Sequence, residues 1–212
     1  MSQKIKLCAI CGINNATTRE HVPPKGIFIK PRPVDLINVP AVLTAIIQPP
    51  LRMKISGSIW AFMSQDILIK ENSFLKKLLF SQPKKNIKLR KQIIVSNKPA
   101  LLKTPGGIIV DMAVIVPWDS DAHDKTIDKI IRGLFYHHHG KIIGSNAEIK
   151  VHFFNEFPVL DIQLDNYSIG YGIFRYGFRK VDDAEYSSVW LFNFYNGHLA
   201  GGYTVKKQYE TT

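Results

Sequence analysis

The segment from Ser120 to Gly140 carries the strongest folding signal in the chain. Its large side chains recur with the period of an α-helix, at positions i, i+3, i+4, i+7, i+8 and i+11: Ile127, Ile130, Ile131, Leu134, Phe135 and His138. Ser120 or Asp121 can cap the start of such a helix, and Gly140 can end it. The sequence therefore predicts one long amphipathic helix over these residues.

Segments typical of β-strands lie on both sides of this helix. Ile108–Val116 precedes it, after the break at Pro105-Gly106-Gly107. Four more follow it: Glu148–Phe154, Ser168–Phe178, Ser188–Tyr195 and His198–Val205. Asn196-Gly197 favours a tight hairpin turn between the last two. We therefore expect residues 104–212 to form an α+β domain, with one antiparallel sheet and one long helix.

The first hundred residues follow another pattern. Prolines divide residues 1–40 into short apolar runs, which leaves no room for a long helix. From Asp66 to Asn97 the chain is rich in lysine and has helical spacing, with a break at Pro83. This pattern predicts two helices with basic outer surfaces. The expected organisation is a small module over residues 1–62, a basic helical connector over 63–103, and the α+β domain.

Charge is divided unevenly between the two halves. Residues 1–103 hold 18 basic and 4 acidic side chains, whereas residues 104–212 hold 10 and 13. A basic half can bind nucleic acid because each neutralised phosphate releases counterions, although a solvated basic surface is the simpler alternative. No apolar run is long enough for a membrane helix, and the N-terminus lacks the apolar core of a signal peptide. We expect a cytoplasmic protein with no membrane partner.

The only two cysteines, Cys8 and Cys11, have the spacing of a zinc knuckle or a redox pair. A redox pair should open a helix after a buried strand, whereas Gly12, Asn14 and Asn15 indicate a tight turn. We therefore favour half of a structural zinc site. A tetrahedral site needs four ligands, and the sequence lacks a second cysteine pair.

Three short motifs carry a resemblance to a known family. They are Cys8-Ala9-Ile10-Cys11-Gly12, Glu20-His21-Val22-Pro23-Pro24-Lys25 and Asp35-Leu36-Ile37-Asn38-Val39-Pro40. Together they resemble the start of HNH endonucleases, the zinc-knuckle branch of the ββα-metal nucleases. The chain looks most like a group of bacterial HNH proteins with a C-terminal extension, to which Ile131-Arg132-Gly133-Leu134-Phe135-Tyr136-His137-His138 is also similar. The resemblance implies an N-terminal ββα-metal module.

It also implies phosphodiester hydrolysis, with DNA favoured over RNA as the substrate. His21 would be the general base, and Glu20 would bind a divalent cation, Mg²⁺ or Mn²⁺, with Asp35 as a further candidate ligand. Cys8 and Cys11 would hold structural zinc. The candidate nucleic-acid contacts are Arg19, Lys25, Lys30 and Arg32. Because adjacent residues of a strand point to opposite faces, we expect an irregular turn near Pro23 to bring Glu20 and His21 together.

The chain departs from the family after Pro40. An HNH module continues into a second Cys-x-x-Cys followed by Asn, but Val42 and Ala45 occupy the positions of those cysteines. Neither side chain can hold zinc, so we expect nuclease activity to be weak or absent. Two alternatives stay open: a non-catalytic nucleic-acid-binding protein, and an interaction module of a defence or toxin system with a protein partner.

Two further features have simpler explanations than a site. His137, His138 and His139 point about 100° apart on a helix, so they cannot all bind one ion, and they favour a role as charges at the helix C-terminus. The aromatic strands Tyr167–Phe178 and Trp190–Tyr195 fit a half-buried sheet better than a base-stacking platform. Exposed basic residues on one face would favour the platform: Arg175, Arg179 and Lys180.

A shift of reading frame would account for the missing cysteines. When residues 41–59 are back-translated and read from the third base of the Ala41 codon, permitted codons yield Cys-x-x-Cys-Asn at the expected place. We predict that the gene carries a local frame slip here, compensated near Met63, and that its codons encode both cysteines in the shifted frame. Sequencing the gene tests this prediction, and codons that cannot yield both cysteines contradict it.

Overall fold

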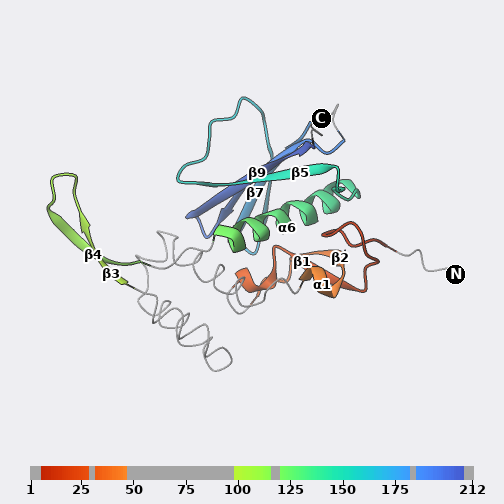
Figure 1. Ribbon diagram of the computed structural model, residues 1–212, viewed down its shortest axis with the longest axis horizontal. Helices are drawn as coiled ribbons and strands as arrows, with labels where there is room; N and C mark the ends of the chain where they lie inside the picture. Colours follow the sequence, from red (N-terminus) through yellow and green to blue (C-terminus); the bar gives the residue numbers. More distant parts are fainter. Residues whose placement is uncertain (1–5, 29–31, 47–97, 116–119, 182–184, 208–212) are drawn as a thin grey trace, which may run out of the picture.

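The computed structural model describes residues 6–28, 32–46, 98–115, 120–181 and 185–207. Its helices and strands, in chain order, are β1 (Thr18–Val22), the 3-10 turn η1 (Lys25–Ile27), β2 (Ile37–Ala41), α1 (Leu43–Ile46), β3 (Lys98–Lys103), β4 (Ile109–Ile115), α6 (Ser120–His139), β5 (Ala147–Phe154), β6 (Asp165–Ile169), β7 (Phe174–Lys180), β8 (Ser188–Phe194) and β9 (His198–Lys206). Figure 1 shows α6 between a large sheet and the N-terminal strands. The expected mixture of helix and antiparallel sheet is confirmed.

The C-terminal part is one five-stranded antiparallel sheet with the order β5-β9-β8-β7-β6. Alternate side chains of β7 and β8 are buried against α6, among them the aromatic residues Phe174, Tyr176, Phe178, Trp190, Phe192 and Phe194. The aromatic stripe is therefore core, as the alternation predicted. Arg175 and Arg179 are exposed on the other face of the sheet, whereas the next residue, Lys180, has the opposite strand parity.

Helix α6 has the predicted bounds. It ends at His139, and Gly140 follows with a φ of +63° and donates its N–H to the Tyr136 carbonyl at 2.8 Å. The apolar stripe of Ile127, Ile130, Ile131, Leu134 and Phe135 is fully buried. Residues Ala122, Thr126, Lys129 and Gly133 form a second buried row. Helix α6 is thus buried on two faces, while the sequence pattern indicated only one.

His138 lies among the aromatic side chains of the sheet rather than in solvent. Its Nε2 is 2.9 Å from the Tyr176 hydroxyl, and its ring packs 4.4 Å from that of Phe178, between centroids. Burial, together with the neighbouring His137 and His139, lowers the pKa of His138 to about 4. Because a histidine with this pKa is neutral at pH 7, the predicted role as a helix-terminal charge is wrong for His138.

Two strand predictions need correction. The predicted strand Ser168–Phe178 is two strands, β6 and β7, because Gly170, Tyr171 and Gly172 take positive φ values of 65°, 55° and 87° and turn the chain. Strand β4 pairs with β3 in a separate hairpin and does not join the large sheet. The predicted domain boundary at residue 104 falls in the turn of that hairpin. The two helices expected between Asp66 and Asn97 lie outside the described residues.

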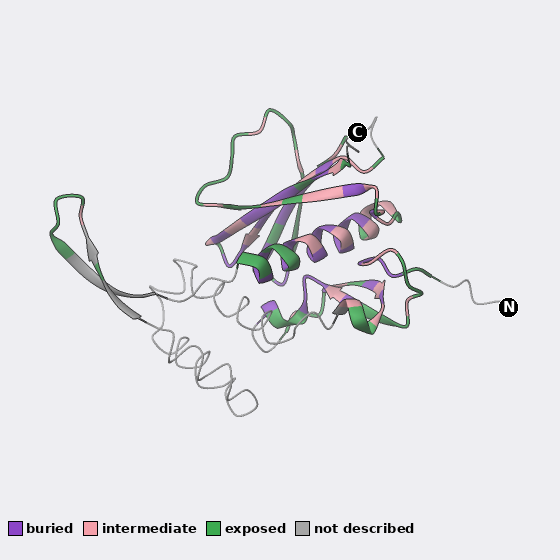
Figure 2. Ribbon diagram, viewed as in Figure 1, coloured by how far each residue is buried: buried purple, intermediate pink, exposed green. Residues whose placement is uncertain are grey.

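The N-terminal strands β1 and β2 form an antiparallel hairpin that packs on the second face of α6. The buried side chains of both parts form one hydrophobic core. Figure 2 marks buried residues in purple on α6, on the large sheet and on the N-terminal strands. Hydrogen bonds between described residues join the parts: the Tyr195 hydroxyl donates to the Ile27 carbonyl at 2.8 Å, and the Gly170 N–H donates to Asp35 Oδ2 at 2.9 Å. Among the described helices, none is both long and apolar enough to cross a membrane.

Helix α6 approaches the hairpin closely at Gly133. A Cβ on Gly133 would lie 2.4 Å from Cγ2 of Val22, which is far inside van der Waals contact. We expect Gly133→Ala to lower the free energy of unfolding by about 1–3 kcal/mol, because the clash outweighs the better helix propensity of alanine. Thermal unfolding followed by circular dichroism measures the effect. Gly26→Ala, where a Cβ would meet nothing within 4 Å, is the matched control; equal melting temperatures for the two variants would contradict the prediction.

Candidate nucleic-acid interface and zinc half-site

The segment from Cys8 to Asn14 folds as a knuckle. The Cys8 N–H donates to the Asn14 carbonyl at 2.8 Å, and the Cys11 N–H points to Cys8 Sγ at 3.5 Å. Gly12 has a φ of +68°, a conformation that glycine adopts without strain. The Ala9 N–H donates to the Pro40 carbonyl at 2.8 Å and so fixes the knuckle to β2. The sequence prediction of a tight turn around these cysteines is confirmed.

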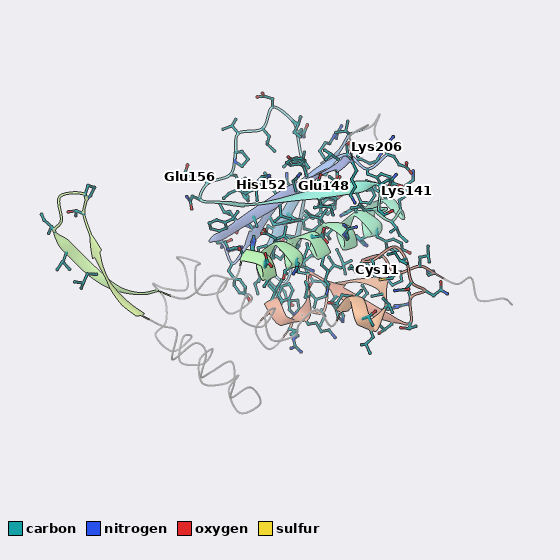
Figure 3. All side chains as sticks on the ribbon, viewed as in Figure 1. Cys11, Lys141, Glu148, His152, Glu156 and Lys206 are labelled. Atoms are coloured by element: carbon teal, nitrogen blue, oxygen red, sulfur yellow. The ribbon has the colours of Figure 1, made fainter. Side chains whose placement is uncertain are left out.

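Cys8 is fully buried, whereas Cys11 is partly exposed, near the N-terminal strands in Figure 3. Burial raises the pKa of the Cys11 thiol, but hydrogen bonds with the backbone of Asn14 and Ile13 and with Cys8 outweigh it and leave the pKa below its ordinary value. A thiolate is the form that binds a metal ion. Cys11 lines a cleft of about 510 Å³ between the knuckle, α6 and β5, and Ala45 lines the same cleft.

The residues around the knuckle do not fit a complete zinc site. Val42 and Ala45, at the positions where the resemblance predicts a second cysteine pair, pack against the hydrophobic core, as does Cys11. No group of three or more His, Cys, Asp or Glu side chains that could hold a metal ion occurs within the described residues. Structural zinc needs four such ligands. The described part of the chain therefore supplies two of the four.

Glu20 and His21 lie on opposite faces of the hairpin. Strand β1 pairs with β2 in regular register from Thr18 to Val22, with Glu20 opposite Val39 and His21 opposite Asn38. Glu20 and Val22 are buried on the side of α6, and His21 is on the other side. The irregular turn that was expected to unite the two side chains begins only after the strand. The structure does not bring Glu20 and His21 to one site.

The carboxylate of Glu20 faces Lys129 of α6. Burial raises the pKa of Glu20, and the charges of Lys129 and then Lys25 oppose that rise. Burial likewise lowers the pKa of Lys129, which Glu20 and then Cys8 oppose. The exposed fractions of the two residues are only 9% and 7%. Sequence reasoning missed Lys129; its signal is the row of small residues Ala122, Thr126 and Gly133, which indicates a second packed face of the helix.

The imidazole of His21 lies among cations. Burial lowers the pKa of His21, and the charges of Lys25 and Arg32 lower it further. Arg32 is held beside Lys25 because its Nε donates to the Lys25 carbonyl at 3.2 Å. Arg19 is exposed and shares the strand parity of His21. The Nδ1 of His21 is buried and has no hydrogen-bond partner within the described residues. We call Arg19, His21, Lys25 and Arg32 the basic face.

The remaining predicted site residues lie elsewhere. Asp35 is exposed and binds the Gly170 N–H, at the junction with the β6–β7 turn. Lys30 lies outside the described residues. Since Glu20 points towards α6, no carboxylate of β1 stands beside His21, and the residues predicted to hold a divalent cation do not fit one centre.

Comparison with known proteins adds no relative: no protein-family model, no curated protein and no solved structure matches this chain.

The position of Val42 and Ala45 allows a direct test of the half-site. We expect the variant Val42→Cys/Ala45→Cys to bind one zinc per chain tightly, because two added thiolates would complete a tetrahedral set with Cys8 and Cys11. Zinc content after purification and the visible absorption of the cobalt-substituted protein measure this. Val42→Ser/Ala45→Ser is the control. If the cysteine variant holds no more zinc than the control, the two positions do not belong to the knuckle.

The Glu20–Lys129 pair predicts a structural role for Glu20. Lys129→Met should lower the free energy of unfolding by about 2–4 kcal/mol, because it leaves a buried carboxylate without its cation. Glu20→Gln combined with Lys129→Met should recover most of that loss. Urea unfolding at pH 7 measures both, with the exposed Lys125→Met on the same helix as the control. Strictly additive effects of the two substitutions would show that the side chains are not coupled.

Proposed function

We propose that this chain is an HNH-like protein that binds DNA through the basic face of its N-terminal hairpin, with weak or absent phosphodiester cleavage. The observation that carries the proposal is the gathering of Lys25 and Arg32 around a partly buried histidine with a depressed pKa. Cations that lower the pKa of a neighbouring imidazole create a positive potential, and a phosphate group is the complementary ligand. The resemblance of the knuckle and of Glu20-His21-Val22-Pro23-Pro24 to HNH nucleases supports nucleic acid as the source of that phosphate.

The basic face has some of the groups that hydrolysis needs. A neutral His21 can accept a proton from water near pH 7, and Lys25 and Arg32 can hold a phosphate beside it. It lacks a carboxylate that could bind a cation to stabilise the leaving oxygen, because Glu20 is buried against α6 beside Lys129. Binding is therefore the better supported part of the function. The contacts go to the backbone of the nucleic acid, so we expect little sequence preference.

Salt-dependent binding tests the proposal. We expect the full chain to bind a fluorescein-labelled 20-base-pair duplex, and Lys25→Gln/Arg32→Gln to weaken binding about tenfold or more at low salt. The slope of log K against log salt should fall by about 2, since each lost phosphate contact removes about one unit. Fluorescence anisotropy at salt concentrations from about 50 to about 300 mM gives both the affinity and the salt slope.

A charge-matched control is Lys141→Gln/Lys206→Gln, which removes two exposed lysines of the C-terminal part, labelled in Figure 3. Equal loss in this control would show that total charge, and not the basic face, governs binding. Digestion of plasmid DNA with Mg²⁺ or Mn²⁺ tests the catalytic half of the proposal. Fast cleavage by the wild-type chain that is lost in His21→Ala would contradict the expected impairment.

A further inference from the structure

The large sheet has a second face that α6 does not cover. Figure 1 shows α6 on one side of the sheet, and the segment after β5, residues 155–164, arching away on the other. A groove with a volume of about 530 Å³ crosses this outer face over β6, β7 and β8. That volume is typical of sites for small organic ligands. Neither the core nor the basic face uses this groove.

The strand register places three polar side chains in one row of the groove. Ser168 of β6 lies opposite Arg175 of β7, and Arg175 lies opposite Asn193 of β8. Since directly paired residues of antiparallel strands point to the same face, the hydroxyl, guanidinium and amide are neighbours. The adjacent row is Asn166, Gly177 and Leu191. Gly177 has no side chain, and a Cβ at Gly177 would lie only 2.8 Å from Asn166 Oδ1.

Asn193 gives the groove an unsatisfied hydrogen-bonding group. Its Oδ1 is buried and has no hydrogen-bond partner among the described residues. A buried amide oxygen without a partner costs on the order of 1–3 kcal/mol, and a bound group with an N–H would remove that cost. The exocyclic amine or ring N–H of a nucleobase is a donor of this kind.

Arg175 supplies the positive charge of the groove. It is exposed, and its Nη2 donates to Asn196 Oδ1 in the β8–β9 turn, which leaves other N–H groups of the guanidinium for an anion. Ser168 adds a hydroxyl beside it. A guanidinium next to a hydroxyl is suited to bind one phosphate group rather than a polyanion.

The walls of the groove are apolar. Phe157, with 38% of its surface exposed, and Leu164 line one part, and Leu191 lines another from the row beside Ser168, Arg175 and Asn193. Such walls accept the flat faces of a ring, as an exposed aromatic side chain does when it stacks on a base. The groove therefore combines apolar walls suited to a ring, the unsatisfied amide oxygen of Asn193 and one arginine suited to a phosphate.

We propose that this groove binds one nucleoside monophosphate unit, with its base against Phe157 and Leu191, its hydrogen-bonding edge at Asn193 and its phosphate at Arg175. The unit is either a free mononucleotide or an unpaired nucleotide of a strand. The choice of a nucleotide rests on the proposed function of the basic face, whereas the groove and its polar row stand independently of it.

Titration of the full chain with each of the four common nucleoside 5′-monophosphates tests the proposal by calorimetry, with inorganic phosphate and the four nucleosides as half-ligand probes. We expect binding of at least one monophosphate with a Kd below about 1 mM, and weaker binding of phosphate or nucleoside alone. Arg175→Gln should weaken it about tenfold or more, and Asn193→Leu about fivefold or more. Arg179→Gln, an exposed arginine of the same strand and face outside the groove, should leave it unchanged.

Arg175→Gln also removes the hydrogen bond with Asn196, so its melting temperature should be compared with that of the wild type to show that it still folds. Phe157→Ala leaves this hydrogen bond intact and should also weaken binding of the monophosphate. A competition experiment with a labelled 12-base single strand distinguishes the two sources of the nucleotide. If unlabelled monophosphate displaces the strand, the groove also binds an unpaired nucleotide of a strand; if it does not, the ligand is the free mononucleotide. The hairpin variant Lys25→Gln/Arg32→Gln should lose duplex binding but keep the monophosphate binding that Arg175→Gln weakens, so a failed basic face and a failed groove are distinguishable. No binding of any monophosphate, or binding unaffected by both Arg175→Gln and Asn193→Leu, overturns the proposal.

Discussion

The burial of α6 on two faces is the constraint on which the rest of the structure depends. The stripe that includes Ile127, Ile131 and Phe135 packs on the five-stranded sheet, and the row of Ala122, Thr126, Lys129 and Gly133 adjoins the N-terminal hairpin. Small residues in the second row allow the close approach of Val22 to Gly133. Without α6, the hairpin would have too little apolar surface to bury, because a two-stranded hairpin alone is marginally stable in water.

This packing also explains how the knuckle is ordered with only two cysteines. Small zinc modules usually depend on the metal for much of their folding free energy. Here Cys8, Ala9 and Ile10 are buried in the same core as α6, and the backbone of Ala9 is hydrogen-bonded to β2. The sheet and α6 thus provide the apolar contacts that a free-standing knuckle lacks.

The same constraint separates Glu20 and His21, the two residues that the sequence motif was expected to bring together. A regular β1 turns Glu20 towards α6, where Lys129 compensates its charge, and turns His21 towards Lys25 and Arg32. The buried pair lies at the interface of the two parts, whereas Lys25 and Arg32 of the basic face are exposed. The second, uncovered face of the sheet then offers Arg175 and Asn193 in a groove far along the chain from the hairpin motif. These are the two surfaces for which we propose phosphate binding, and their geometries differ.

Local patterns in the sequence determined the elements that depend on local chemistry. The helical period of Ile127 to Phe135 and the stop at Gly140 predicted the bounds of α6. Asn196-Gly197 predicted a hairpin, and Cys8-x-x-Cys11 with Gly12 predicted a tight turn. These predictions succeeded because helix periodicity and turn conformation are set by neighbouring residues. The turn at Gly170–Gly172 was missed, although its glycines were a visible signal. Only the tertiary structure decided that Lys129 faces Glu20, that His138 is neutral among aromatic rings, and that Ser168, Arg175 and Asn193 share a groove. These relations join residues from different elements, and burial and charge compensation between such residues depend on the packing of the whole fold.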